Sequence, residues 1–345
     1  MNKGHIVVAM SGGVDSSLAA TLLKQEGYEV SGIHLKLWPN PEHDISDLER
    51  TCQLLDIPLQ QLNLETEFKR LVIDYFVQEY SLGRTPNPCI VCNQRIKFGL
   101  LLDKTLQMGA DYLATGHYTR IEPTPNGYRL LRAADYTKDQ SYFLYTLGQK
   151  ELQHLLFPLG NLRKTDVRKL AAELNLPASH KRDSQNVCFI PDNDYRAFVA
   201  EHISLKPGDI INTKGEVLGK HSGLAKYTVG QRQGLGLAST EHLYVIKLNA
   251  DSNSLVVGTE SQLLNNTLTA SNLFWLLGEI PKEIINIAAR IRYRAPQVAA
   301  KLQINNGTAT VQFHEPQRAI TPGQSIVFYQ GDTVLGGGII EDRVD

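Results

Sequence analysis

The sequence has few cysteines, no long apolar segment and almost no net charge, and each of these absences excludes a class of protein. Only four cysteines occur in 345 residues, with no secretion signal at the start, which excludes a disulfide-stabilised secreted scaffold and predicts a reducing cytoplasm. No apolar run approaches the length of a membrane-spanning helix, so we expect no membrane partner. A net charge of −1 does not by itself indicate nucleic-acid binding.

Residues 6–24 combine a buried strand, a glycine-rich turn and a helix. Residues 6–10 are apolar and β-branched, as in a strand buried on both faces, and residues 18–24 have a helical pattern. Gly12 and Gly13 allow backbone N–H groups to approach a ligand, and the helix N-terminus adds unpaired donors, so we expect a phosphate-binding loop. No lysine follows the glycines, so this is not the loop of common nucleotide hydrolases. It resembles the loop of pyrophosphatases that cleave ATP between its α- and β-phosphates.

The remaining pattern predicts an α/β fold with two further β-rich parts. Strands alternate with helices over residues 1–202, which predicts a doubly wound parallel sheet with ligands beyond the carboxyl ends of its strands. Short strands between Gly, Asn and Pro turns follow. We expect a small central β-rich domain at 203–262 and a C-terminal β-barrel at 263–345.

The cysteines fall into two kinds. Cys52 lies on an apolar helical stripe and is expected to be a packed thiol. Cys89 and Cys92 form a C-x-x-C pair after two prolines, which alone indicates a redox pair, half a metal site or coincidence. We expect a helix over residues 95–108, so that Cys92 lies near its N-terminus, where the helix dipole favours the thiolate. An ATP-activating loop together with cysteines on loops points to sulfur chemistry.

Two basic clusters stand out against the neutral background. Six Lys or Arg residues lie between Arg163 and Arg182, and a second cluster contains Arg290, Arg292, Arg294 and Lys301. Each cluster is either a polyanion-binding patch or an ordinary solvated surface.

Several motifs together resemble one family, the bacterial tRNA-specific 2-thiouridylases (the MnmA/TrmU family) of the PP-loop ATP pyrophosphatase superfamily. The resemblance covers essentially the whole chain in the family's order. Its motifs lie at residues 11–17, 83–88, 92–93, 115–118, 138–141, 183–190, 227–232 and 290–294.

The resemblance implies ATP-dependent replacement of O2 by sulfur at the wobble uridine of tRNA, with ATP and Mg²⁺ as cofactors. ATP adenylates O2 of the uracil and releases pyrophosphate. The positions implied to bind ATP are Ala9, Met10, Ser11, Gly12, Gly13, Val14, Asp15, Ser16, Leu35 and Gly116.

The same resemblance implies the sulfur and RNA positions. Cys188 carries a persulfide received from a sulfur-relay protein or cysteine desulfurase, and Cys92 is the nucleophile that frees this sulfur through a transient Cys92–Cys188 disulfide. The target base leaves its stack, and the basic clusters hold the tRNA backbone. The implied base contacts are Asn87, Pro88 and Cys89, and the implied tRNA contacts are His117, Lys138, Asp139, Gln140, Arg292, Tyr293 and Gln324.

Two departures from the family pattern leave alternatives open. Cys89 stands where well-known members have an aspartate, a candidate acid/base, and it completes a set of three thiols with Cys92 and Cys188. Related tRNA thiolation enzymes with such a set hold a [4Fe–4S] cluster, so a cluster-based route is an alternative to the persulfide. The segment between Trp38 and Asp47 is shorter than the family's usual insertion.

Two further alternatives concern the function itself. A small-molecule synthetase would share the phosphate-binding loop without needing reactive cysteines, and a tRNA-binding protein without activity would keep the loop as a structural turn.

Overall fold

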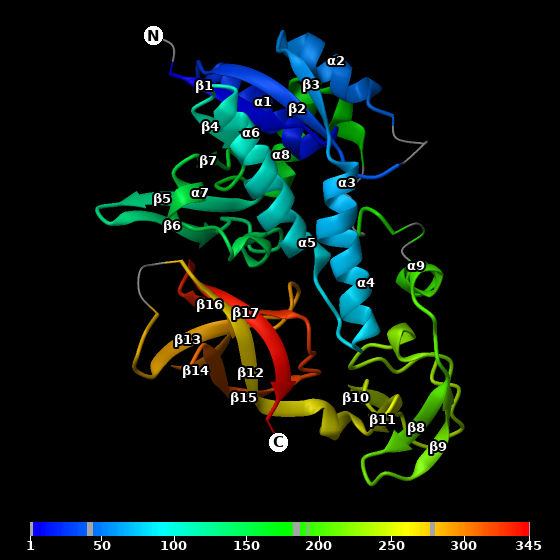
Figure 1. Cartoon of the computed structure of the whole chain (residues 1–345). Helices are drawn as coiled ribbons and strands as arrows, with labels where there is room; N and C mark the ends of the chain where they lie inside the picture. Colours follow the sequence, from blue (N-terminus) through cyan, green and yellow to red (C-terminus); the bar gives the residue numbers. More distant parts are fainter. Residues whose placement is uncertain are drawn as a thin grey trace. The chain divides into compact units, whose positions relative to one another are not determined.

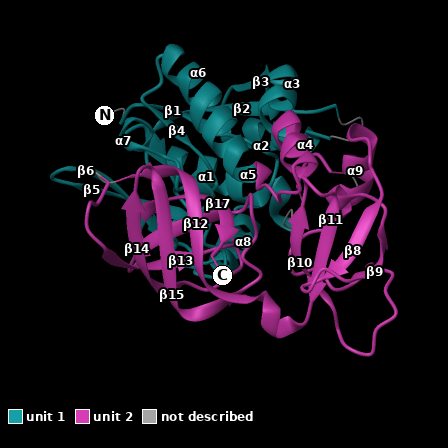
Figure 2. Ribbon diagram, turned by 60° about the horizontal axis from the view of Figure 1, so that its bottom comes forward, with its two compact units in different colours: residues 1–72, 89–185, 332–334 teal, residues 73–88, 186–331, 335–345 magenta. Residues whose placement is uncertain are grey.

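The chain separates into two compact units. The computed structural model describes residues 3–39, 44–181, 187–190, 192, 194–276 and 280–344. The first unit contains residues 1–72, 89–185 and 332–334, and the second contains 73–88, 186–331 and 335–345 (Figure 2). None of the described helices has the length and apolar character needed to cross a bilayer.

The first unit is built on a five-stranded sheet in which every pair of neighbours is parallel (Figure 1). The strands are β1 (His5–Ala9), β2 (Glu29–Lys36), β3 (Leu59–Asn63), β4 (Tyr112–Ala114) and β7 (Leu155–Leu156), in the order β3-β2-β1-β4-β7. Ile6, Val7 and Val8 are completely buried, as predicted for a strand covered on both faces. The chain winds to one side of β1 through β2 and β3 and to the other through β4, so the strand order reverses beside β1. This reversal is where such sheets bind ligands.

The helices of the first unit pack their apolar residues against the sheet and each other. Ala20 and Leu23 of α1 (Val14–Gln25) share a core with Cys52 of α2 (Ser46–Leu55) and with β1, so Cys52 is the packed thiol that we predicted. Leu18 on α1 packs with Val167 of α8 (Lys164–Glu173). Further helices described in this unit are α3 (Glu65–Phe68), η1 (Lys69–Ile73, which ends one residue into the second unit), α6 (Leu102–Gln107), η3 (Ser141–Leu144), α7 (Gln149–Leu152) and η4 (Pro177–His180). A hairpin of β5 (Thr119–Thr124) and β6 (Gly127–Arg132) completes it.

The helix that carries Cys89 and Cys92 begins earlier than predicted. It starts at Pro88 as α5 (Pro88–Val91) and continues as η2 (Cys92–Leu101), with the wider i→i+5 bonding of a π-helix, into α6. The expectation that the helix begins only at residue 95 was wrong, because a proline at the first helical position only removes an N–H that would have no intrahelical partner. Cys89 therefore lies in the first turn of the helix and Cys92 directly after it.

The second unit contains α4 (Asp74–Ser81), α9 (Tyr195–His202) and two β-rich parts. The central part is a four-stranded sheet in the order β10-β11-β8-β9, as predicted. Its strands are β8 (Gly208–Asn212), β9 (Val217–His221), β10 (Tyr244–Asn249) and β11 (Ser254–Gly258), with the short helices η6 (Leu224–Lys226) and η7 (Glu260–Leu263).

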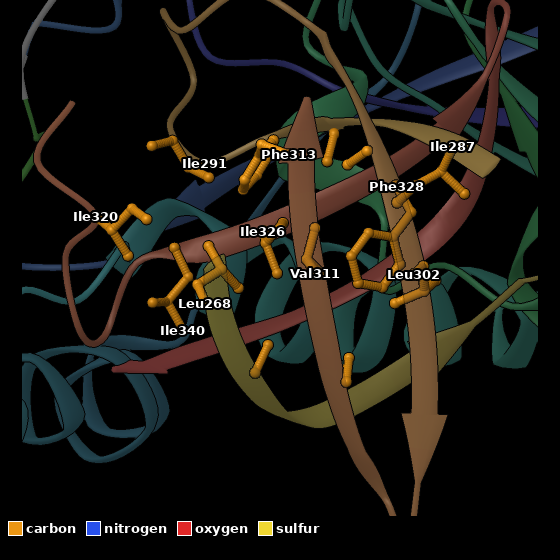
Figure 3. Close-up of a cluster of buried hydrophobic side chains, with 14 of the residues drawn as sticks. Leu268, Ile287, Ile291, Leu302, Val311, Phe313, Ile320, Ile326, Phe328 and Ile340 are labelled. Carbon is orange, nitrogen blue, oxygen red and sulfur yellow. The ribbon is translucent and has the colours of Figure 1, made fainter. Parts of the chain in front are cut away.

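The C-terminal part is the predicted β-barrel. Six strands run in the order β12-β15-β14-β13-β16-β17, and pairing of β12 with β17 closes the ring. Leu268, Val311 and Phe328 are among the apolar side chains that fill its interior (Figure 3). The strands are β12 (Leu264–Trp275), β13 (Ile285–Arg290), β14 (Val298–Asn305), β15 (Thr308–Arg318), β16 (Ser325–Gln330) and β17 (Thr333–Arg343).

Candidate active site

The glycine-rich loop emerges at the carboxyl end of β1 and leads directly into α1. Gly12 has a φ of +76°, in the left-handed region that glycine adopts without strain. The hydroxyls of Ser16 and Ser17 each donate to the carbonyl of Gly13, 3.1 Å away. Gly13 is the N-cap and has no side chain that could accept a bond from the first turn. The first N–H groups of α1 are thus open to an anion.

The turn after β4 packs against the same helix end. A Cβ on Gly116 would lie 2.8 Å from the carbonyl carbon of Asp15 and 2.9 Å from the nitrogen of Ser16. Leu35 is half-buried at the carboxyl end of β2, next to β1. The structure therefore brings the implied ATP-binding residues of three strands to one edge of the sheet.

Two residues near this loop were missed by the sequence analysis. The Nδ1 atom of buried His34 lies 2.8 Å from the carbonyl oxygen of Met10 and holds the loop's first residue. The Nζ atom of Lys164 lies 2.7 and 2.8 Å from the two carboxylate oxygens of Asp15. Lys164 belongs to the predicted basic cluster at 163–182, but it is buried and ion-paired, so it is not part of a solvated basic surface.

The thiols of the C-x-x-C pair are protonated at neutral pH. Burial raises the pKa of Cys92 to about 11, although the nearby Lys97 ammonium opposes this shift. Burial also raises the pKa of Cys89, again opposed by Lys97. The helix dipole was expected to favour the Cys92 thiolate, but the pKa of Cys92 is raised and not lowered, because loss of hydration outweighs the favourable charge of Lys97.

Cys188 has a different environment. It is exposed and lies in the second unit, in a turn that includes Phe189 and Ile190. The motif residues at 183–185 lie outside the described residues.

His117 is enclosed by aromatic rings of the first unit. Its ring lies 5.6 Å from that of Phe98 and 6.0 Å from that of Phe157, and Thr115 Oγ1 is 2.6 Å from its Nδ1. Burial, assisted by the charge of Lys97, places the pKa of His117 well below its usual 6.5, so the imidazole is neutral at pH 7.

The motif at residues 138–141 builds a turn. Asp139 is buried and accepts hydrogen bonds from the Ala133 and Ser141 N–H groups, at 3.2 and 3.1 Å, and forms an ion pair with Arg132 at 3.3 Å. Gln140 accepts from the backbone of Tyr118 at 2.9 Å. Both implied tRNA contacts thus have internal hydrogen-bond partners.

Arginines of the second basic cluster also bind within the second unit. Arg290 is buried and donates to the carbonyls of Ala295 and Tyr293, at 3.0 and 2.8 Å, so its place in a basic surface patch was wrong. Nη2 of Arg292 donates to the carbonyl of Val229, 3.2 Å away. The same atom donates to the carbonyl of Ala319 at 3.1 Å and to the hydroxyl of Thr321.

Among the described residues, no three or more His, Cys, Asp or Glu side chains gather closely enough to hold a metal ion. Cys89 and Cys92 belong to one unit and Cys188 to the other. The [4Fe–4S] alternative therefore stays a prediction.

Comparison with known proteins covers almost the whole chain. Family models match residues 4–192, described as a tRNA methyl transferase HUP domain, 196–259, described as its PRC-barrel domain, and 265–340, described as an aminomethyltransferase β-barrel domain. The tRNA-specific 2-thiouridylase MnmA of Moorella thermoacetica is 48% identical over 97% of this chain and 99% of its own. The protein of the same name from Geotalea uraniireducens is 47% identical over 99% of this chain and 96% of its own.

A solved 4-thiouridine synthetase–RNA complex with bound ATP is a distant likeness, with a TM-score of 0.38 and 19% identity over 55% of this chain and 46% of its own. The two MnmA proteins, by contrast, match this chain over nearly their whole length. Their identities of 48% and 47% indicate a shared family and not only a shared fold. This chain belongs to the tRNA-specific 2-thiouridylase family.

Proposed function

We propose that this chain is a tRNA-uridine 2-sulfurtransferase, which uses ATP to replace O2 of the wobble uridine with sulfur. The observation that carries the proposal is its 48% identity to a tRNA-specific 2-thiouridylase over nearly the full length of both chains. The proposal places the protein in the cytoplasm, together with its tRNA substrate.

The first step activates the uracil. Its O2 attacks the α-phosphorus of ATP, and the bond to the β-phosphate oxygen breaks, so that the electron pair leaves with pyrophosphate. The uncapped N-terminus of α1 and the loop at residues 9–16 bind the phosphates, while Leu35 and Gly116 line the nucleotide pocket. The Asp15 carboxylate, one-third exposed beside the loop, is an oxygen ligand of the kind Mg²⁺ prefers. Bound Mg²⁺ would neutralise part of the phosphate charge.

The second step transfers the sulfur. Exposed Cys188 takes a persulfide from a sulfur-relay protein or cysteine desulfurase. Cys92 attacks Sγ of Cys188, which forms a disulfide and releases hydrosulfide; the hydrosulfide attacks C2 and displaces AMP. A thiol reductant then restores both cysteines. Cys92 must lose its proton first, and Lys97 is the cation that favours this loss.

The remaining implied positions complete the proposal as RNA contacts. Asn87, Pro88 and Cys89 would meet the target base. His117, Lys138, Asp139, Gln140, Arg292, Tyr293 and Gln324 would contact the tRNA or hold the segments that do.

The test is mass analysis of unmodified tRNA after incubation with the protein, ATP and a persulfide donor. The mass gain of sulfur replacing oxygen at the wobble uridine is expected only with ATP. Cys92→Ser and Cys188→Ser should abolish it, while Cys52→Ala, which alters the packed thiol, should retain it. Unchanged thiolation by Cys92→Ser would contradict the persulfide route. Iron measured in the same anaerobic sample decides between the persulfide and a [4Fe–4S] cluster.

A further inference from the structure

A lysine from a distant part of the sequence lies at the phosphate-binding loop. Lys164 is the first residue of α8, 149 positions after Asp15, and its side chain is only 9% exposed. Lysines are rarely buried to this degree unless they are paired or functional. Nothing in the loop motif itself supplies a cation, since no lysine follows its glycines.

The ammonium of Lys164 is held by a small polar cluster. Asp15 accepts from it through both carboxylate oxygens, at 2.7 and 2.8 Å. The Tyr118 hydroxyl donates to the same carboxylate at 2.7 Å, and the Tyr118 ring centroid lies 5.5 Å from Nζ. Lys164 is further fixed through its backbone N–H, which donates to Asp135 at 3.0 Å. Its position is thus determined by several contacts at once.

A structural role alone does not account for this placement. Asp15 lies in the first turn of α1, whose N-terminus already carries a partial positive charge, so an added ammonium is electrostatically unfavourable there. A buried ion pair stabilises a fold little more than a well-packed apolar pair would. Uncapped helix donors and an ammonium held beside the first turn of the same helix suit a ligand that carries several negative charges.

We propose that Lys164 binds the β- and γ-phosphates of the nucleotide, with its ammonium moving from Asp15 to the phosphate oxygens when ATP enters. The inference rests on the proposed use of ATP. Asp15, one-third exposed, is then released to water or Mg²⁺. A cation at the pyrophosphate end also favours cleavage between the α- and β-phosphates, because negative charge accumulates on the departing pyrophosphate.

The test compares binding of ATP, pyrophosphate and AMP to the whole chain by calorimetry. Lys164→Met should weaken ATP and pyrophosphate binding by about tenfold to a hundredfold, as expected for a lost charge-assisted hydrogen bond. AMP, which lacks the β- and γ-phosphates, should bind within about twofold of wild type, because it does not reach the ammonium. The matched control is Lys169→Met on the same helix, whose partner Glu173 is 3.8 Å away and exposed; it should change none of the three affinities.

Two further variants separate phosphate binding from fold support. Lys164→Gln keeps a donor for Asp15 without the charge and should show the same selective loss in a chain with normal thermal unfolding. The double variant Asp15→Asn/Lys164→Met has no charge at either position. If it bound ATP as tightly as the wild type, Lys164 would serve only to neutralise Asp15, and the inference would be overturned. Equal losses for ATP and AMP would also overturn it. A wild-type chain that binds no ATP would instead overturn the proposed function.

Discussion

The side-chain amide of Gln324 donates a hydrogen bond to the carbonyl of Thr85, 2.8 Å away. The N–H of Thr85 in turn donates to the carbonyl of Pro322 at 2.9 Å, and a Cβ on Gly323 would lie 2.9 Å from the Thr85 nitrogen. Arg84 forms an ion pair with Glu341 of β17 at 2.6 Å. The turn before β16 and the end of β17 thus hold the segment that leads to Asn87, the first implied base contact.

Gln324→Ala should lower the stability of the second unit. The substitution leaves the carbonyls of Thr85 and Pro86 without this donor, which should reduce the free energy of unfolding by about 1 kcal/mol. Denaturant unfolding measures the loss, and thiolation activity should fall with it. Gln312→Ala, at an exposed position of β15, is the control and should unfold as the wild type does. Normal unfolding combined with lost tRNA affinity would show instead that Gln324 contacts the RNA directly.

Gly116→Ala should separate the β4 turn from the end of α1. The new methyl group would meet backbone atoms of Asp15 and Ser16 at under 3 Å, and backbone cannot move aside as a flexible side chain can. Such overpacking costs about 1–3 kcal/mol, so ATP affinity should fall by about tenfold or more. Isothermal calorimetry with ATP measures it. Gly27→Ala is the control: it strains a φ of +91° at the far end of α1, but its Cβ meets no atom within 4 Å. It should lose stability and keep ATP affinity.

Features encoded by neighbouring residues could be predicted from the sequence, and features made by distant residues could not. The loop at residues 10–17 follows from a strand, two glycines and a helix in succession, and the barrel follows from alternating strands and turns. Lys164 could not be assigned to the loop, because only the packing of α8 on α1 brings it there. The roles of Arg290 and Arg292 were equally hidden, because a basic sequence has the same charge whether its guanidinium groups bind carbonyls or face water.

Alkylation should modify Cys188 long before Cys92 at pH 8. The thiolate is the reactive form, and burial that raises the pKa of Cys92 to about 11 leaves little of it, whereas Cys188 is exposed. Lys97→Met removes the opposing positive charge, so it should raise the pKa of Cys92 further and slow its alkylation. Peptide mass spectrometry after timed iodoacetamide exposure measures both rates. Lys104→Met, exposed on α6 of the same helix, should leave them unchanged.

The raised pKa of Cys92 also makes the free energy of unfolding fall as the pH rises above 9. The Cys92 thiol has an ordinary pKa of 9.0 and a pKa of about 11 in the fold, so the folded state favours the protonated form. Its contribution is complete below pH 9 and is lost as the pH rises toward 11. In denaturant unfolding, wild type should therefore lose more stability than Cys92→Ala between these values. Parallel profiles for the two proteins would show that Cys92 ionises as easily in the fold as in the unfolded chain.

Alanine substitutions of Arg292 and Arg294 should affect the salt dependence of tRNA binding differently, although the two residues belong to one basic motif. Nη2 of Arg292 is used by the carbonyls of Val229 and Ala319, while Arg294 is exposed. Arg294→Ala should reduce the slope of log Kd against log salt by about 1, as expected when one phosphate contact is lost. Arg292→Ala should lower the thermal stability of the second unit and weaken binding without changing that slope.

Filter binding of unmodified tRNA over a series of salt concentrations measures both slopes, and thermal unfolding of the same samples measures stability. Gln303→Ala on β14 of the same barrel removes a polar side chain without a change in charge and should alter neither quantity. An Arg292→Ala chain with normal unfolding and a slope reduced by about 1 would assign Arg292 directly to a tRNA phosphate. Its Nη2 bonds would then position the guanidinium for the RNA.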